Sequence, residues 1–242
     1  MSEKPVPAAR GPAGTPPAPP VRPRRRAGRP RGHDPERTRR RILDAAERLF
    51  AEGGYDGTSI RDVAAAADVQ LNAVGYHFGP KGALFDAVVG RRAAIMTELR
   101  RDALAEIRSE AGEAPPPLGG LIRAYVAPFI RSADHGEPGW RAYAALMGRL
   151  ANSPQGTEII ARHYDDTARE YLAAFRLALP DADRADLVDG FSALVAAMLG
   201  ICADTGRRGR LGATPARRDA DESIAMLVAF HTAGFEALDR GS

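Results

Sequence analysis

The feature that most limits the fold of this chain is the spacing of its apolar residues, which follows helical periodicity from about residue 42 almost to the end. No segment alternates convincingly between apolar and polar residues, as a half-buried strand does. Glycine and proline interrupt the helical pattern at lengths that are typical of helical bundles. The chain is therefore predicted to be all-α.

Composition narrows the class of protein further. The chain has 242 residues, of which 44% are hydrophobic and 27% are charged, so it is long enough to bury a substantial core. It has no run of about 18 apolar residues and no apolar segment near its start, which argues against a membrane span or secretory signal and predicts a cytoplasmic protein. Cys202 is the only cysteine, so an internal disulfide is excluded.

The charges are distributed unevenly along the chain. Residues 1–41 carry twelve basic and three acidic side chains, a net charge of +9, whereas the rest carries 22 basic and 28 acidic ones, a net charge of −6. Residues 1–33 also hold nine of the 19 prolines and almost no large apolar residue, so we expect a disordered tail there. A basic arm on an acidic body suggests an anionic polymer as partner, and the alternative is a solvated arginine-rich tail.

Three helices are predicted directly after the tail. Asp34 is the N-cap of the first, with Pro35 at its first position, and Gly53–Gly54 ends it. Ser59 and Asp62 form a capping box for the second, and Thr58 is the alternative cap. A turn over 67–69 leads into the third helix, over 70–78, which Gly79–Pro80 stops. Two short helices joined by a three-residue turn predict a helix-turn-helix.

The remaining chain is predicted to form a bundle of longer helices. One runs from Lys81 to about Ala111, with Leu84, Val88, Ile95, Leu99 and Ile107 on one face. Further helices are expected at about 118–133, 140–151, 157–179, 183–204 and 219–238, separated by a triple proline, a glycine–proline loop and a loop that contains arginine and glycine.

Residues 40–89 closely resemble the N-terminal DNA-binding domain of tetracycline-repressor (TetR) family regulators. The residues that carry this resemblance are Ile42, Ala45, Ala46, Phe50, Gly54, Tyr55, Thr58, Ile60, Ala64, Val69, Tyr76, His77, Phe78 and Lys81. The resemblance implies a DNA-binding domain over 34–80 and a helical ligand-binding and dimerisation domain over 81–242. The segment Asn72–Lys81, together with the apolar run over 118–130, resembles a subgroup that contains fatty-acid-responsive regulators, which implies a fatty-acyl effector.

The exposed side of the third helix is the predicted reader of DNA, because the second helix of a helix-turn-helix enters the major groove. With Val69, Val74 and Phe78 as buried anchors, the positions left for DNA or solvent are Gln70, Leu71, Asn72, Ala73, Gly75, Tyr76 and His77. Asn72 is the best candidate for base reading because its amide can pair with adenine. Leu71 and Ala73 can only make apolar contacts with thymine methyl groups.

The resemblance implies further contacts. It places Arg61 at guanine and Thr58, Tyr76, His77 and Lys81 at phosphates, and Ser59 belongs to the same predicted contact region. The chain departs from the usual family pattern at Asp68, where glycine is common, at Gln70, where serine or threonine usually caps, and at Gly75, where tyrosine is usual. Gly75 marks either a close approach of the backbone to DNA or a weak helix.

The tail contains one short motif of its own. Gly28-Arg29-Pro30-Arg31 resembles the core of an AT-hook, in which an extended segment lies in the minor groove of A·T tracts. Arg29 and Arg31 are therefore candidate DNA contacts, and nonspecific attraction to phosphates is the alternative.

The C-terminal part offers candidates for the walls of an effector pocket, and ordinary core packing is the alternative for each. They are Tyr125, Phe129, Trp140, Tyr143, Met147, Tyr164 and Phe175, with His163 as a polar point. His163, Asp165 and Asp166 do not share one helix face, so no metal site is predicted there.

The segment 183–204 is apolar almost all round, so it must be covered on more than one side. Pairing it with 219–238 and with the same pair of a second chain predicts a four-helix homodimer interface, and a deeply buried helix of a monomer is the alternative. The predicted interface residues are Phe191, Leu194, Val195, Met198, Leu227 and Phe235. A two-fold dimer fits a palindromic operator with one recognition helix per half-site.

Common catalytic and nucleotide-binding motifs are absent from the sequence, so we expect neither an enzyme nor a cofactor. The predicted function is that of a ligand-responsive transcriptional regulator, a repressor that a small apolar or amphipathic effector releases from double-stranded DNA. The alternative is a ligand-independent, architectural DNA-binding protein.

Overall fold

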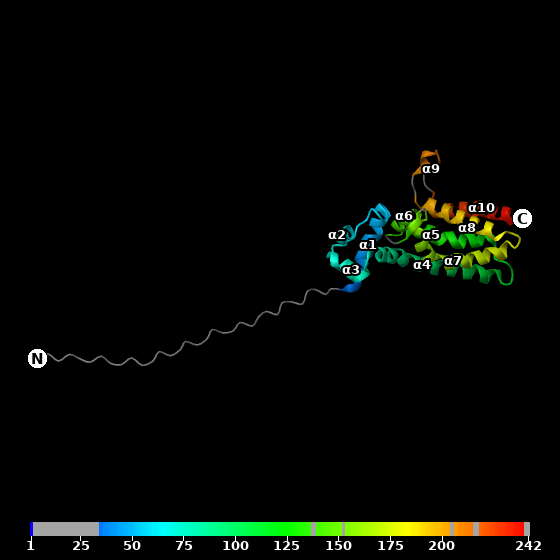
Figure 1. The fold of residues 1–242 in the computed structure, drawn as a ribbon. Helices are drawn as coiled ribbons and strands as arrows, with labels where there is room; N and C mark the ends of the chain where they lie inside the picture. The colour runs from blue at the N-terminus through cyan, green and yellow to red at the C-terminus, as the bar shows by residue number, and fades with distance from the viewer. Residues whose placement is uncertain (2–33, 137–138, 152, 204–205, 215–217, 240–242) are drawn as a thin grey trace. The chain divides into compact units, whose positions relative to one another are not determined.

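A computed structural model describes residues 34–136, 139–151, 153–203, 206–214 and 218–239, together with Met1. Within these ranges every regular element is a helix and none is a strand, which confirms the all-α class (Figure 1). The chain divides into two units, Met1–Asp34 and Pro35–Ser242, and all of the helices belong to the second. Apart from Met1, the predicted tail with Arg29 and Arg31 lies outside the described residues.

The three N-terminal helices begin and end close to where the caps and glycines predict. α1 (Pro35–Gly53) buries Ile42, Ala45, Ala46 and Phe50, and it packs against α2 (Ile60–Ala66). α3 (Leu71–Phe78) follows and is anchored by the fully buried Val74. α2 and α3 form the helix-turn-helix.

The long helix α4 (Lys81–Ala111) has the predicted length, but its buried face differs from the predicted one. Leu84 and Val88 are buried, whereas Ile95 and Leu99 are 43% and 41% exposed. The buried positions continue instead through Arg92, Met96, Arg100 and Leu104. The predicted face was wrong because it was traced through apolar residues only, whereas the inward face of α4 includes Arg92 and Arg100.

The C-terminal bundle consists of α5 (Leu118–His135), α6 (Trp140–Leu150), α7 (Pro154–Ala178), α8 (Arg184–Cys202) and α10 (Ala220–Asp239), and a short helix α9 (Arg207–Arg210) that was not predicted lies between the last two. α5 packs against α4 and α10, and α8 packs against α6 and α10 (Figure 1). α6 also contacts α1. The bundle is thus in direct contact with the first helix of the N-terminal part.

Candidate nucleic-acid interface and effector site

The start of α2 is held by local hydrogen bonds. The Ser59 hydroxyl accepts a hydrogen bond from the backbone N–H of Asp62 at 3.2 Å, and the Asp62 carboxylate accepts one from the backbone N–H of Ser59 at 3.1 Å. The Ser59 hydroxyl also donates a hydrogen bond to the Asp62 carboxylate at 2.6 Å, and this bond, together with the one from the Ser59 backbone N–H, lowers the pKa of the Asp62 carboxyl. The predicted capping box is therefore present, and Ser59 serves the helix start.

The turn between α2 and α3 depends on an unusual backbone conformation. Asp68 has a φ of 51°, in the left-handed region that favours glycine. Arg41 of α1 donates hydrogen bonds to the backbone oxygen and to the carboxylate of Asp68, both at 2.9 Å. Aspartate adopts the left-handed conformation more readily than most residues, and the two hydrogen bonds from Arg41 hold it there. Together these explain why the turn tolerates aspartate where glycine is usual.

The outer side of α3 presents a mixture of polar, apolar and aromatic groups. Asn72 and Gly75 are exposed, Tyr76 is 85% exposed and Leu71 is 48% exposed. Gln70 is the exposed N-cap, but its side chain makes no capping hydrogen bond. Ala73 and His77 are half-buried. The exposed amide of Asn72 and hydroxyl of Tyr76 can form hydrogen bonds with another molecule, and the exposed Leu71 can make apolar contacts with it.

Thr58 has a different environment from the one that a phosphate contact needs. Its side chain is buried, and its hydroxyl donates hydrogen bonds to the backbone oxygens of Leu49 and Gly54, both at 3.0 Å. Thr58 therefore ties the end of α1 to the start of α2. Arg61 is exposed on α2, and the ammonium of Lys81 lies 4.3 Å from the centre of the Tyr55 ring.

A buried ionic cluster joins α1 to the bundle. Glu47 of α1 is 2% exposed, and it accepts a hydrogen bond from Nε of Arg92 at 3.0 Å and another from Arg91. Arg91 also donates to Asp44 at 2.6 Å. The guanidinium of Arg92 lies 4.9 Å from the centre of the Trp140 ring, on α6. One cluster thus connects α1, α4 and α6.

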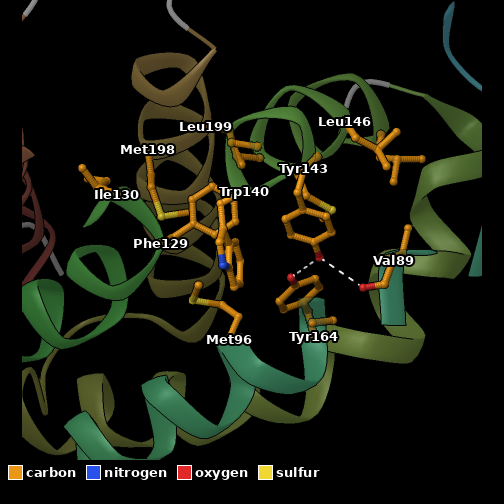
Figure 2. Packing of buried hydrophobic residues seen from close by; sticks show 14 of the residues in the cluster. Val89, Met96, Phe129, Ile130, Trp140, Tyr143, Leu146, Tyr164, Met198 and Leu199 are labelled. Carbon is orange, nitrogen blue, oxygen red and sulfur yellow. Dashed lines mark hydrogen bonds between the residues drawn. The ribbon is translucent and has the colours of Figure 1, made fainter. Parts of the chain in front are cut away.

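The predicted effector residues gather in the bundle, next to this cluster. Tyr125, Phe129, Trp140, Tyr143, Met147, Tyr164 and Phe175 are all buried in one continuous core. Figure 2 shows the hydroxyl groups of Tyr143 and Tyr164 pointing toward each other, 2.5 Å apart, and the Tyr143 hydroxyl also reaches the backbone oxygen of Val89 at 3.4 Å. Burial raises the pKa of Tyr143 well above its usual range and that of Tyr164 to about 12.

His163 lies at the edge of this cluster rather than inside it. It is half-buried, and its Nε2 is 3.1 Å from a carboxylate oxygen of Asp86 on α4. The same oxygen accepts a hydrogen bond from Arg162. His163 therefore belongs to a polar contact between α4 and α7.

The predicted pocket residues do not line either of two open hollows in the described part of the bundle. One, of about 910 Å³, lies between α7 and α8 and is lined by residues that include Leu172, Arg176 and Leu187. The other, of about 700 Å³, is lined by residues that include Ile130, Arg141 and Met226. The aromatic cluster is packed core in this conformation.

Sequence reasoning missed Arg100, which lies inside the aromatic cluster and is 2% exposed. Its guanidinium carbon is 3.8 Å from the centre of the Tyr125 ring. The signal was present in the sequence, because Arg100 follows Arg92 and Met96 at intervals of four along α4.

The predicted dimer residues are mostly enclosed by their own chain. Phe191, Leu194, Met198, Leu227 and Phe235 are buried within the single chain, and Val195 is half-buried. The five buried residues therefore contribute little to the surface that α8 and α10 offer to another molecule in this conformation, whereas Val195 is partly open. When a helix is apolar almost all round, its sequence does not show which side packs against its own chain and which side packs against a partner.

The outward face of the α8–α10 pair is made by other residues. Val188 is 40% exposed and Phe230 is 71% exposed. Many other exposed residues of these two helices are small, namely Ala185, Ser192, Ala193, Ala196, Gly200, Ala225, Ala229, Ala233, Gly234 and Ala237. The charged Arg184, Asp189, Glu222 and Glu236 are exposed on them as well. Among the described helices, α8 alone is long and apolar enough to cross a membrane, yet only 28% of its most apolar window is buried. Such a helix is weak evidence for a membrane span, because helices that pack on protein surfaces have the same composition.

Two family models match this chain. The model described as "Bacterial regulatory proteins, tetR family" matches residues 42–88, and the model described as "Tetracyclin repressor-like, C-terminal domain" matches residues 123–234. The first covers α2 and α3 with parts of α1 and α4, and the second covers most of the bundle from α5 to α10.

Curated relatives share part of the sequence. The HTH-type transcriptional repressor Rv1474c of Mycobacterium tuberculosis is 31% identical over 144 residues, which span 55% of this chain and 75% of that protein. The HTH-type transcriptional repressor AcnR of Corynebacterium efficiens is 30% identical over 118 residues, which span 48% of this chain and 63% of that protein. The match to AcnR of Corynebacterium glutamicum is 40% identical but spans only 36% of that protein.

Solved structures share the fold at low sequence identity. A TetR-like transcriptional regulator from Rhodococcus sp. RHA1 has a TM-score of 0.59 at 19% identity, covering 82% of this chain and 96% of that one. The ketosteroid transcriptional regulator KstR2 of Mycobacterium tuberculosis has a TM-score of 0.54 at 18% identity, covering 81% of this chain and 93% of that one.

Proposed function

Because this chain belongs to the tetR family of bacterial regulatory proteins, we propose that it is a homodimeric transcriptional repressor. In this proposal each α3 helix binds the major groove of one half-site of a palindromic operator. A small apolar or amphipathic effector in the bundle releases the protein from DNA. Residues 34–80 are the proposed DNA-binding domain, and residues 81–242 are the proposed effector and dimerisation domain, acting in the cytoplasm where the operator lies.

The observation that carries the DNA-binding proposal is the outer side of α3. Asn72 and Tyr76 are exposed there, and Arg61 is exposed on α2 of the same helix-turn-helix. An amide and a guanidinium can form paired hydrogen bonds with base edges, whereas a phenol hydroxyl and an ammonium hold phosphates. We assign base reading to Arg61 and Asn72, and phosphate contacts to Tyr76 and Lys81. Thr58 is not part of this proposal, since both of its hydroxyl contacts are internal.

The observation that supports effector control is the direct contact between the bundle and α1. Glu47, Arg92 and Trp140 join the first helix of the DNA-binding domain to α4 and α6, which also carry Arg100 and Tyr143 of the aromatic cluster. A ligand shifts an equilibrium only by its different affinity for two states. A ligand that moves Trp140 therefore has a short route to the position of α1 and α3.

The proposed dimer surface is the outward face of α8 and α10, where Val188 and Phe230 are the large exposed apolar residues. The small exposed residues of these helices allow two helix pairs to approach closely. A two-fold dimer would give two recognition helices for the two halves of a palindrome. A fatty-acyl effector and a minor-groove contact by Arg29 and Arg31 remain part of the proposal.

The test starts with recovery of the genomic fragments that the purified protein binds. Substituting Arg61 or Asn72 by alanine should cost about 1–3 kcal/mol and relax the preference at one base pair per half-site. Tyr76→Phe and Lys81→Ala should weaken binding to all sequences alike. A base preference that changes in Lys81→Ala but not in Arg61→Ala would contradict the assigned roles.

Release of the operator by small molecules separates the repressor from a ligand-independent architectural protein. A screen of small apolar and amphipathic compounds, read by fluorescence anisotropy of the labelled operator, should yield compounds that release the protein. If the screen covers acids, alcohols, amines and steroids and none releases the operator, the architectural alternative is favoured.

A further inference from the structure

Arg100 is a buried cation without a counter-ion in the part of the chain that the structure describes. Its Nε donates a hydrogen bond to the backbone oxygen of Tyr125 at 3.0 Å, and its Nη2 lies 3.7 Å from the sulfur of Met198. No described carboxylate lies within ion-pair distance, and Nη1 makes no hydrogen bond to a described residue.

Aromatic rings provide the remaining surroundings of this group. The guanidinium carbon is 3.8 Å from the centre of the Tyr125 ring, 5.8 Å from that of Tyr164 and 5.9 Å from that of Phe129. Ring faces attract a cation, but they offset only part of what burial costs a charge.

Arg92 provides a comparison on the same helix. It is also buried, at 5% exposure, and it is paired with the equally buried Glu47. Within the described ranges, a carboxylate thus pairs with one buried arginine of α4 and none pairs with the other. Buried arginines are ordinarily paired.

The positive charge of Arg100 also acts on the tyrosines around it. Burial raises the pKa of Tyr143, Tyr164 and Tyr171, and the charge of Arg100 opposes this rise in all three. The guanidinium of Arg100 is thus close enough to three buried tyrosines to act on their hydroxyl groups.

We propose that Arg100 is the counter-ion for the carboxylate of an effector that carries a single negative charge on an apolar body. The proposal rests on the proposed function in one respect, since it takes the occupant of the bundle to be the effector. The Nη1 edge of the guanidinium can donate hydrogen bonds to one carboxylate, and the Tyr164 ring, whose hydroxyl is paired with that of Tyr143, has its centre 5.8 Å from the guanidinium carbon.

The charge and the walls of the site limit the ligand class. A phosphate monoester carries nearly two negative charges at neutral pH, and one arginine would leave part of that charge unmatched. Met96 and Met198 are buried in the cluster, with Phe129 and Trp140 beside them (Figure 2), and Met147 is buried in the same core. Methionine side chains adapt easily to a new neighbour, so packed core can open around an apolar body.

The first part of the experiment needs no ligand. Arg100→Met in the full chain replaces an unmatched charge by an apolar side chain of similar length, so it should leave the melting temperature unchanged or raise it. Arg92→Met is the matched control, because it removes an equally buried arginine that is paired with Glu47 and leaves that buried carboxylate with Arg91 alone, so it should lower the melting temperature. If Arg100→Met lowers it as much as Arg92→Met, Arg100 is a structural residue and the proposal is overturned.

The second part measures binding through Trp140, the only tryptophan of the chain. The probes are hexanoate, decanoate, palmitate, phenylbutyrate and cholate, each compared with the alcohol of the same body, or for cholate with its methyl ester. At least one acid should bind wild type about tenfold or more tightly than its neutral partner, as expected for a charged hydrogen bond. This preference should disappear in Arg100→Met, or in Arg100→Gln if the methionine variant does not fold, while the neutral partner binds as before.

The outcomes separate this inference from the proposed function. An acid that binds through Arg100 but leaves the operator complex intact would support the anion site and refute effector control by its occupant. Equal affinity of all acids and neutral partners for wild type, or a preference that persists without Arg100, would overturn the inference. In that case release of the operator by a neutral compound would leave the proposed function standing.

Discussion

Gly75 offers the sharpest test of how α3 meets DNA. It lies in the second half of an eight-residue helix, it is exposed, and a Cβ built there would meet no heavy atom within 4 Å. The fold itself therefore does not require glycine at this position. Gly75→Ala adds one methyl group to the outer side of α3 and nothing else.

Two effects of opposite sign are expected. Alanine is favoured over glycine inside a helix by about 1 kcal/mol, and the open space means that no clash reduces this gain. For a chain of this size such a gain raises the melting temperature by about 2–4 °C. If the backbone of α3 lies against the DNA, the same methyl group must be accommodated in a packed interface, which costs about 1–3 kcal/mol, or about 5- to 150-fold in operator affinity.

Thermal denaturation and operator titration at fixed salt measure the two effects on the same protein. Gly148→Ala on α6 is the matched control, since a Cβ there also meets nothing within 4 Å and the site is outside the helix-turn-helix. It should gain stability without a change in operator affinity. If Gly75→Ala gains stability and binds the operator as well as wild type, close approach of the α3 backbone to DNA is refuted. If it loses stability, the helix argument is refuted.

Three further predictions concern stability. Asp68→Ala should be less stable than Asp68→Gly by about 1–2 kcal/mol in urea denaturation, because both variants lose the carboxylate contact with Arg41 but only alanine keeps a Cβ in the left-handed region; equal values would mean that the turn relaxes. Glu47→Gln should cost about 3–5 kcal/mol, because two arginines lose a buried carboxylate, and a loss below about 1 kcal/mol in the same assay would contradict a tight cluster. Burial lowers the pKa of His231 from 6.5, so the unfolded chain takes up its proton first as the pH falls, and the folded state should lose stability below about pH 6.5. His231→Leu should flatten this loss in denaturation curves between about pH 7 and pH 5, and an unchanged slope would assign the loss to other groups.

The parts of the fold that local chemistry determines were predictable. Pro35, the Ser59–Asp62 box and the Gly79–Pro80 break act on the nearest turn of the chain, so the bounds of α1, α2 and α3 follow from a few residues. The position of Asp68 in the turn was also visible, as a departure from the expected glycine.

What depends on distant partners was predicted less well. Ile95 and Leu99 were predicted on the buried face of α4 but are exposed, because the inward face of α4 is decided by the helices that cover it. Arg100, for which nothing was predicted, is buried on that inward face. Thr58 resembled a phosphate ligand until its two backbone acceptors on the preceding segment were known. In the same way, nothing in the composition of α8 distinguishes Phe191, which faces its own chain, from Val188, which faces outward.

The outward face of α8 and α10 also bears on how the protein must be made. These two helices are the last long ones in the chain, so they leave the ribosome after the helices they cover. Until another surface covers them, Val188 and the strongly exposed Phe230 remain open to any apolar partner in the cell. When few subunits are present, each would spend more time unpaired and exposed to chaperones or to aggregation. The lifetime of the folded subunit should therefore increase with the amount synthesised, because pairing depends on concentration.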